Sequence, residues 1–326
     1  MPLTVSVIVT VYNEGPSITR LLDSLAAQAR TPDEVVIVDG GSTDNTLDLL
    51  QSFGARGGWP LRVYSRPGAN ISQGRNIAIA AAQGEVIAVT DAGVRLDPRW
   101  LEELIRPFEQ DPTVDTVAGF FVPDPQTSFE TAMGATVLPA VTDVDPDTFL
   151  PSSRSVAFRK AAWSATEGYP EWLDYCEDVR LDLQLYGRFG PFHFAPRALV
   201  YFRPRPNLFS FFVQYYRYAR GDGKANLWPK RHAVRYLAYF VLLPALLLMA
   251  WQHSPWWLIG LLTGGAAYTL QPYRRLGQAM RPLACHQKLY AIALVPVIRL
   301  VGDVAKMIGY PAGWAWRLRH RREIPR

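Results

Sequence analysis

Cysteine is scarce in this chain of 326 residues, because only Cys176 and Cys285 are present and they lie far apart. Two isolated cysteines provide neither the spacing of a zinc site nor a disulfide framework, so both kinds of stabilised domain are excluded. Such low cysteine content is expected of a chain that folds in a reducing, cytoplasmic environment. The first apolar run also lacks the charged start of a signal peptide and is typical of a strand.

Acidic residues are nearly absent from the second part of the chain. From Arg197 onward there are 3 Asp and Glu against 20 Lys and Arg, whereas the part up to Pro196 has 26 against 14. A basic segment can bind nucleic acid, but this one alternates with long apolar runs and tryptophans. That combination favours a membrane surface with anionic lipids, and we expect no nucleic-acid partner.

Charge is entirely missing from two apolar runs, 236–251 and 255–270. Each is shorter than the roughly 20 residues that cross a bilayer easily, but basic clusters flank the pair. A hairpin of two spans returns both clusters to the cytoplasmic side, so we predict a transmembrane helical hairpin at about 235–272. A buried hairpin of a soluble protein is the alternative. The charges within 286–318 make a third span costly and predict interfacial or re-entrant helices there.

Short apolar runs alternate with amphipathic runs of helical period from Thr4 to about Val122. This alternation predicts an α/β fold with a mostly parallel sheet flanked by helices. We place this domain at residues 1–225 and a helical membrane-attachment region at 226–326. In such a sheet, ligands bind beyond the carboxyl ends of the strands. The candidate residues that follow the apolar runs are Tyr12, Asn13, Glu14, Asp39, Gly40, Gly41 and Asp91.

Asp39 ends an apolar run and precedes glycines that permit a tight turn. Its carboxylate suits hydrogen bonds to a ribose or to the edge of a base. The alternative is an acid that only caps the turn. Ser17, which follows Glu14, has the same two interpretations, because it can simply begin a helix.

Five short motifs follow one another in a fixed order between about residues 4 and 225: VTVYNE, VDGGSTDNT, GRNIAIAAAQGE, TDAG and CED. Together they resemble the inverting family 2 glycosyltransferases of GT-A fold, which implies a nucleotide-sugar donor, either a UDP-sugar or a GDP-sugar. The resemblance implies that Thr10, Tyr12 and Glu14 line the nucleotide pocket. It also implies that Asp39 holds the base or ribose and that Arg75 faces the diphosphate or the sugar.

Asp91 matches the first acid of the family's Asp-x-Asp metal motif, and Gly93 stands where the second acid is usual. The resemblance therefore implies Mg²⁺ or Mn²⁺ as cofactor, with Asp91 as its protein ligand. One carboxylate suffices when the diphosphate and water complete the shell. Asp97 and His193 are further candidates for the metal, although a structural histidine is the better interpretation of the second. Alternatively, Arg75 or a basic residue of the tail neutralises the diphosphate.

An inverting transfer requires a base that removes the proton of the acceptor hydroxyl. Segment 168–190 resembles the acceptor-side segment of the family, and by this match Asp178 is the base and Glu177 is its neighbour. Two acids at the start of a helix also complement the helix dipole, so a purely structural role is the alternative. Asp174 and Asp182 are weaker candidates for the base.

The run QYYRYARGDGK resembles the family's Gln-x-x-Arg-Trp signature, with Gln214 and Arg217 in place and Tyr218 where tryptophan is usual. The resemblance places these residues over the acceptor and the donor phosphates. A guanidinium offers planar hydrogen bonding to phosphate, and a tyrosine ring can still stack on a sugar. An aromatic and arginine-rich helix that lies along a membrane is the alternative.

The predicted activity is the transfer of a sugar from a nucleotide-sugar to a lipid or lipid-linked acceptor at a membrane, with the catalytic domain facing the cytoplasm. A processive polysaccharide synthase is one alternative, but the apolar segments are too few for a translocation channel. A non-catalytic scaffold that binds nucleotide-sugars is the other, and Gly93 is its only support.

Overall fold

The computed structural model describes residues 3–54, 58–322 and 324. Contacts divide the chain into two compact units. The first comprises Met1–Asp124 and Ala140–Arg203, and the second comprises Pro125–Pro139 and Pro204–Arg326. The domain boundary expected near residue 225 stays a prediction.

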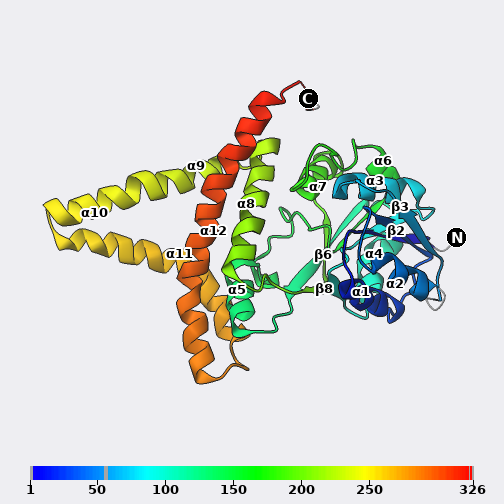
Figure 1. The fold of residues 1–326 in the computed structure, drawn as a ribbon, viewed down its shortest axis with the longest axis horizontal. Helices are drawn as coiled ribbons and strands as arrows, with labels where there is room; N and C mark the ends of the chain where they lie inside the picture. Colours follow the sequence, from blue (N-terminus) through cyan, green and yellow to red (C-terminus); the bar gives the residue numbers. More distant parts are fainter. Residues whose placement is uncertain (1–2, 55–57, 323, 325–326) are drawn as a thin grey trace. The chain divides into compact units, whose positions relative to one another are not determined.

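A single eight-stranded sheet forms the centre of the first unit (Figure 1). Its strands are β1 (Val5–Val11), β2 (Glu34–Asp39), β3 (Leu61–Ser65), β4 (Val86–Val89), β5 (Val94–Leu96), β6 (Thr116–Pro123), β7 (Val156–Arg159) and β8 (His193–Phe202). They lie in the order β3-β2-β1-β4-β7-β6-β8-β5. Four of the seven pairings are parallel, and β7 and β5 run antiparallel to their neighbours. The predicted α/β fold with a mostly parallel sheet is confirmed.

Helices cover both faces of this sheet. They are α1 (Pro16–Ala26), α2 (Thr46–Gly54), α3 (Ile71–Ala81), α4 (Trp100–Gln110), α6 (Lys160–Ser164) and α7 (Glu177–Phe189), with a short 3-10 turn at Val141–Asp143. Val7 and Val9 of β1 belong to the core cluster that contains Leu21 of α1, whereas Ile8 belongs to the cluster that contains Ile79 of α3. Side chains alternate between the faces of a strand, so an apolar strand such as β1 is buried on both sides.

The start of α3 lies close against the end of β1. A Cβ atom at Gly74 would lie 2.8 Å from Thr10 Cγ2, so only glycine permits this approach. The helix begins with a capping box, in which Asn70 Oδ1 accepts from the Gln73 N–H at 2.9 Å and Gln73 Oε1 accepts from the Asn70 N–H at 3.0 Å. Packing and capping together fix Arg75, in the second turn of α3, near the carboxyl ends of the strands.

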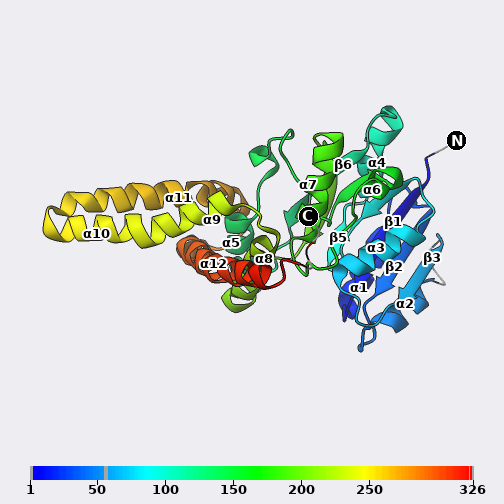
Figure 2. The same ribbon diagram turned by 90° about the horizontal axis from the view of Figure 1, so that it is seen from above.

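The second unit is helical. Its helices are α5 (Ser128–Val137), α8 (Leu208–Ala225), α9 (Pro229–Leu237), α10 (Leu243–Gln252), α11 (Leu258–Ala279) and α12 (Cys285–Arg319), with a π-helical turn at Ala238–Leu242 and a 3-10 turn at Pro255–Trp257. Helices α8 and α12 lie side by side (Figures 1 and 2). A Cβ at Gly309 would lie 2.3 Å from the Tyr216 carbonyl, and one at Gly313 would lie 2.0 Å from that of Arg220. Glycines on α12 therefore let the two backbones touch.

Helices α9 and α10 run on from one another and form a hairpin with α11 (Figure 2). The segment Pro229–Gln252 has 24 residues and a mean hydropathy of 1.9 in its most apolar window, none of which is buried. Among the described residues it is the one helix long and apolar enough to cross a membrane. A helical hairpin is therefore present, and one of its two arms has the length and composition of a span. That the hairpin crosses a membrane stays a prediction.

Segment 286–318, which we predicted to hold interfacial or re-entrant helices, lies within one continuous helix of 35 residues, α12. Two of the charges that made a span costly in this segment have partners within the second unit. Asp303 accepts a hydrogen bond from Arg235 Nε at 2.8 Å, and Arg299 donates to the Tyr268 carbonyl at 3.0 Å. Paired charges cost less to bury than isolated ones, so the helix continues past them.

Candidate active site

A cavity of about 150 Å³ opens at the carboxyl ends of β1 and β2, beside the start of α3. Thr10, Tyr12 and Glu14, the three residues predicted to line a nucleotide pocket, all lie around it. The ring of Tyr12 is 62% exposed and is available to stack on a flat group. The other lining residues are Val11, Val38, Gly40, Ala69, Asn70, Ile71 and Gly74.

Hydrogen bonds fasten the loop after β1 to the loop after β2. Asn13 has a left-handed backbone, with φ of 53°, and its Oδ1 accepts from the Thr43 N–H at 2.8 Å. Thr46 Oγ1 accepts from the N–H groups of Glu14 and Gly15, both at 2.9 Å. These bonds hold one wall of the cavity in place before any ligand arrives.

Asp39 is fully buried at the end of β2. Its carboxylate accepts hydrogen bonds from the Gly41 N–H at 3.0 Å and from the Ser42 N–H at 3.1 Å. The side chain therefore holds its own turn, and it is not among the residues that line the cavity. A contact between Asp39 and a base or ribose stays a prediction.

A buried ion cluster surrounds Arg75. Its Nη1 lies 2.7 Å from Glu177 Oε1 and its Nη2 lies 2.9 Å from Asp91 Oδ1, while its Cζ lies 5.1 Å from the centre of the Tyr169 ring. Burial opposes the charge, yet Tyr169, Asp91 and Glu177 together raise the pKa of the guanidinium above its ordinary value. The Arg75 guanidinium, predicted to face the diphosphate or the sugar, thus forms ion pairs with two acids of the chain.

The acids of this cluster outnumber its buried arginine. Burial, and then repulsion from Asp178, raise the pKa of Glu177 to about 7. The same two causes raise the pKa of Asp182 well above its usual range, and its buried Oδ2 has no hydrogen-bond partner among the described residues. Carboxyl groups that crowd one cation in this way hold protons at pH values where exposed acids have lost them.

Asp178, the predicted base, begins α7 together with Glu177 but is only half-buried. Its Oδ1 accepts from the Val179 N–H at 2.9 Å, which leaves its other oxygen for a further partner. Cys176, just before the pair, has a left-handed backbone with φ of 64°, an unusual conformation for a residue with a Cβ. This turn places Glu177 inside the cluster and Asp178 at its accessible edge.

Arg154 also belongs to the site, although it was not predicted from the sequence. Its Nε lies 3.7 Å from Asp91 Oδ2, and its Cζ lies 4.7 Å from the centre of the Phe202 ring. The residue lies in a short polar segment before β7 and matches no motif. A lone arginine in a polar segment is the one feature that the sequence offers here, and it does not indicate that the partner of this arginine is Asp91.

Asp91 fits a divalent cation as a single protein ligand. Its Oδ1 is bound by Arg75, whereas among the described residues its Oδ2 has only the ion pair of 3.7 Å with Arg154. Gly93 adds no ligand, and no group of three His, Cys, Asp or Glu suited to a metal occurs in the described parts of the chain. Asp97 accepts from the Tyr201 hydroxyl at 3.1 Å, and His193 lines a different cavity of about 380 Å³. The remaining ligands would have to come from a bound diphosphate and water.

Gln214 and Arg217 lie on α8 in the second unit. Gln214 Nε2 donates to the Tyr218 hydroxyl at 2.8 Å, one turn further along the helix. This bond orients the tyrosine that stands where the family signature has tryptophan. The roles of both residues toward an acceptor and phosphates stay predictions.

Comparison with known proteins identifies the domain that carries these side chains. The family model for glycosyl transferase family 2 matches residues 6–161, which include β1 to β4, Arg75, Asp91 and Arg154. Residues 6–161 form a family 2 glycosyltransferase domain.

Two curated relatives match part of this chain. An uncharacterized glycosyltransferase of Nostoc sp. is 34% identical over 114 residues, which make up 34% of this chain and 35% of that protein. The chondroitin synthase of Pasteurella multocida is 33% identical over 114 residues, 35% of this chain and 12% of the synthase. The chain therefore aligns with about a third or less of the length of these relatives.

A solved structure shows the same fold over most of the chain. The mannosyltransferase PcManGT from Pyrobaculum calidifontis, in complex with GDP-Man and Mn²⁺, superposes with a TM-score of 0.62 at 21% identity. The match covers 94% of this chain and 88% of that protein. The fold of the glycosyltransferase domain is GT-A, as predicted.

Proposed function

We propose that this chain is an inverting glycosyltransferase that moves a sugar from a nucleoside-diphosphate sugar to a hydroxyl or phosphate of a lipid or lipid-linked acceptor. The observation that carries the proposal is the ion cluster of Arg75, Asp91 and Glu177 with Asp178 at its edge. Burying several acids around one guanidinium costs stability, and such clusters gather at functional sites. Arg75 and Asp91 of this cluster lie in the family 2 domain, at the carboxyl ends of strands where ligands bind.

The donor would bind in the cavity beside β1. The exposed ring of Tyr12 would stack on the base, and the N-terminus of α3, which begins at Ile71, would face the diphosphate. The cavity lining includes backbone at Gly40, where a ligand can approach closely. The complex of PcManGT with GDP-Man supports a nucleoside-diphosphate sugar, and the donor here would be a GDP-sugar or a UDP-sugar.

Asp178 would act as the base toward a hydroxyl acceptor. The acceptor oxygen forms a bond to the anomeric carbon, the bond from that carbon to the diphosphate breaks, and the hydroxyl proton passes to Asp178. Attack from the face opposite the diphosphate inverts the anomeric centre. Glu177 would be a positioning residue, because Arg75 Nη1 holds it at 2.7 Å, next to Asp178 at the start of α7.

Negative charge that develops on the leaving diphosphate needs stabilisation. Arg154, half-buried beside Asp91, would supply a guanidinium toward that charge. A divalent cation such as Mg²⁺ or Mn²⁺, held by Asp91 and the diphosphate oxygens, would add Lewis-acid stabilisation when bound. PcManGT with its Mn²⁺ supports this cofactor.

The second unit would attach the chain to a membrane. The apolar face of Pro229–Gln252 is unburied within the protein, so lipid is the surrounding that suits it. Arg231 and Arg235 precede the hairpin of α10 and α11, and Arg274 and Arg275 follow its apolar part. With basic residues on the cytoplasmic side, both ends of the hairpin and the catalytic domain would face the cytoplasm.

The experiment is a measurement of nucleoside diphosphate release from a panel of UDP-, GDP- and dTDP-sugars, with the full chain in native membrane extract that supplies the acceptor. Release from one donor is expected, and Asp178→Asn is expected to abolish it while nucleotide binding persists. Asp23→Asn, the same chemical change on the exposed face of α1, serves as the matched control. Unchanged release by Asp178→Asn would assign the base to another group.

Absence of release from every donor would favour a scaffold that binds nucleotide-sugars without transfer.

The length of the product distinguishes a single transfer from the remaining alternative, processive synthesis. One sugar added per acceptor is expected, whereas a ladder of many lengths would identify a processive polysaccharide synthase.

A further inference from the structure

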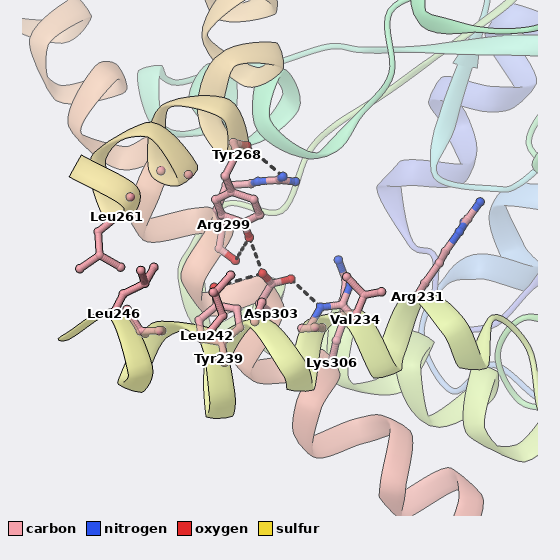
Figure 3. A pocket seen from close by; sticks show the side chains of 16 residues that line it. Arg231, Val234, Tyr239, Leu242, Leu246, Leu261, Tyr268, Arg299, Asp303 and Lys306 are labelled. Atoms are coloured by element: carbon pink, nitrogen blue, oxygen red, sulfur yellow. Dashed lines mark hydrogen bonds and ion pairs between the residues drawn. The ribbon is translucent and has the colours of Figure 1, made fainter. Parts of the chain in front are cut away.

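A second, larger cavity lies wholly within the second unit, between the hairpin and α12 (Figure 3). Its volume is about 540 Å³, which is within the roughly 300–1,000 Å³ typical of ligand sites. None of the residues that line it belongs to the candidate active site. One part of its wall is polar and charged, and the rest is apolar.

The apolar wall comes from the two arms of the hairpin. Leu242 and Leu246 approach from one arm and Leu261 from the other (Figure 3). Gly264 and Gly265 on α11 have no atoms within 4 Å of where a Cβ would lie, so the wall is hollowed there. The same arms carry exposed apolar side chains on the outside, including Leu247, Leu248 and Trp251. This part of the cavity suits a hydrocarbon chain.

The polar wall has more positive than negative charge. Four basic residues line it, Arg231, Arg235, Arg299 and Lys306, against the single acid Asp303. Asp303 accepts from Arg235 Nε at 2.8 Å, from the Tyr239 hydroxyl at 3.1 Å and from the Tyr268 hydroxyl. Its charge is thus satisfied by Arg235 and two tyrosines, and three cationic groups are left over.

Two of these cations are poorly satisfied inside the protein. Lys306 has no hydrogen bond or ion pair within the described residues, and its Nζ lies 4.9 Å from the centre of the Tyr215 ring. Burial lowers the pKa of this ammonium to about 8. Arg299 stacks 3.9 Å from the centre of the Tyr268 ring, and its buried Nε lacks a hydrogen-bond partner. Donors left in this state bind an anion without first breaking a bond.

We infer that this cavity binds a membrane lipid that carries a phosphate headgroup, with Lys306 and Arg299 at the phosphate and the hydrocarbon chain along Leu242, Leu246 and Leu261. Charge complementarity selects an anion for the polar wall, because three cationic groups lack an acid. The apolar wall selects a ligand whose anionic group continues into a chain. A lipid phosphate has both parts in that order, and the segment that forms the wall is itself suited to a bilayer. The inference stands independently of the proposed transfer reaction.

Lipid binding is measured with the full chain purified in a neutral detergent. A fluorescent short-chain phosphatidic acid is titrated, and its anisotropy reports binding without any sugar donor. Lys306→Gln and Arg299→Gln are each expected to weaken binding roughly tenfold, the size of one charge-assisted hydrogen bond. Lys230→Gln, which removes the same charge from an exposed position of α9 outside the cavity, is the matched control and is expected to change affinity less than twofold.

A further variant tests the apolar wall without changing charge. Gly264→Phe places a ring in open space, replaces a helical glycine and fills the hollow, so the fold is retained while lipid binding weakens at least tenfold. Circular dichroism of each variant confirms that the helices persist. Equal weakening by Lys230→Gln and Lys306→Gln would overturn the inference, because general surface charge would then explain binding.

Two competitors identify what the cavity recognises. The diacylglycerol with the same chains lacks the phosphate and is expected to compete at least tenfold more weakly than unlabelled phosphatidic acid. Inorganic phosphate is expected to compete only at concentrations at least a hundredfold higher. Competition by inorganic phosphate at the concentration of the lipid would assign the site to free phosphate, and equal competition by diacylglycerol would show that the headgroup is not recognised. Either result refutes the inference.

Discussion

Replacement of Glu177 by glutamine tests the ion cluster most directly, because it removes one titrating group and keeps the shape of the side chain. Burial, followed by repulsion from Asp178, raises the pKa of Glu177 from its ordinary value of 4.5 to about 7. The folded chain therefore holds this proton at pH values where the unfolded chain has lost it. The stability that the proton contributes is fully present below pH 4.5 and is lost as the pH rises through about 7.

The magnitude follows from the difference between the two pKa values. About 2.5 units at roughly 1.36 kcal/mol per unit correspond to about 3 kcal/mol. Between pH 4.5 and pH 8, the free energy of unfolding of the unchanged chain is expected to fall by about 3 kcal/mol more than that of Glu177→Gln. Asp182 also has a raised pKa in both proteins, and because repulsion from Glu177 is the smallest of its causes, most of its contribution cancels in the comparison.

The assay is urea unfolding of the full chain in neutral detergent, followed by tryptophan fluorescence at several pH values across this range. Glu167→Gln, which changes an exposed acid of the same unit, is the control and should keep the pH dependence of the unchanged chain. If Glu177→Gln also keeps that dependence, Glu177 titrates at an ordinary pKa and the cluster does not hold its proton as argued.

Three further predictions follow from other parts of the structure. Arg75→Met leaves Glu177 and Asp91 without their guanidinium, and it is expected to lower the free energy of unfolding at pH 8 by about 3–5 kcal/mol, whereas exposed Arg66→Met should change it by less than about 0.5 kcal/mol. In electron paramagnetic resonance, the signal of free Mn²⁺ is expected to persist with the chain alone and to fall when a nucleoside diphosphate is added, because Asp91 is a single ligand; loss of signal without nucleotide would reveal a complete protein site. The double change Leu247→Asp and Leu248→Asp places two charges on the exposed apolar helix, and flotation with phosphatidylcholine vesicles is expected to be lost, while retention would argue against insertion of this arm.

Much of the sheet was predictable because it is buried on both faces. The strands β1, β2, β3 and β4 are short apolar runs separated by amphipathic helices, and this alternation is visible in the residues alone. The other half of the sheet was harder, because β5 has three residues and β8 pairs parallel with β6 and antiparallel with β5. Pairings between segments a hundred residues apart depend on packing that local periodicity does not contain.

The site residues likewise divide into those that could be predicted from the sequence and those that could not. The positions of Thr10, Tyr12 and Glu14 could be anticipated, since each follows or ends a strand. The different environments of Glu177 and Asp178 could not, because neighbouring residues on a helix differ by about 100° in direction and the sequence does not give the rotation of α7. Arg154 was missed because its partner Asp91 lies 63 positions earlier and no motif connects them.

Gly93 has a consequence for how readily this active site could change. Its backbone lies outside the left-handed region, and a Cβ there would meet no atom within 4 Å. An aspartate could therefore be accommodated at this position without any movement of the loop. A site with one acid and a site with two acids are thus compatible with the same backbone. The two differ only in the codon for residue 93. The number of protein ligands that such a domain offers to a divalent cation can therefore change during evolution, or by design, while the fold stays the same.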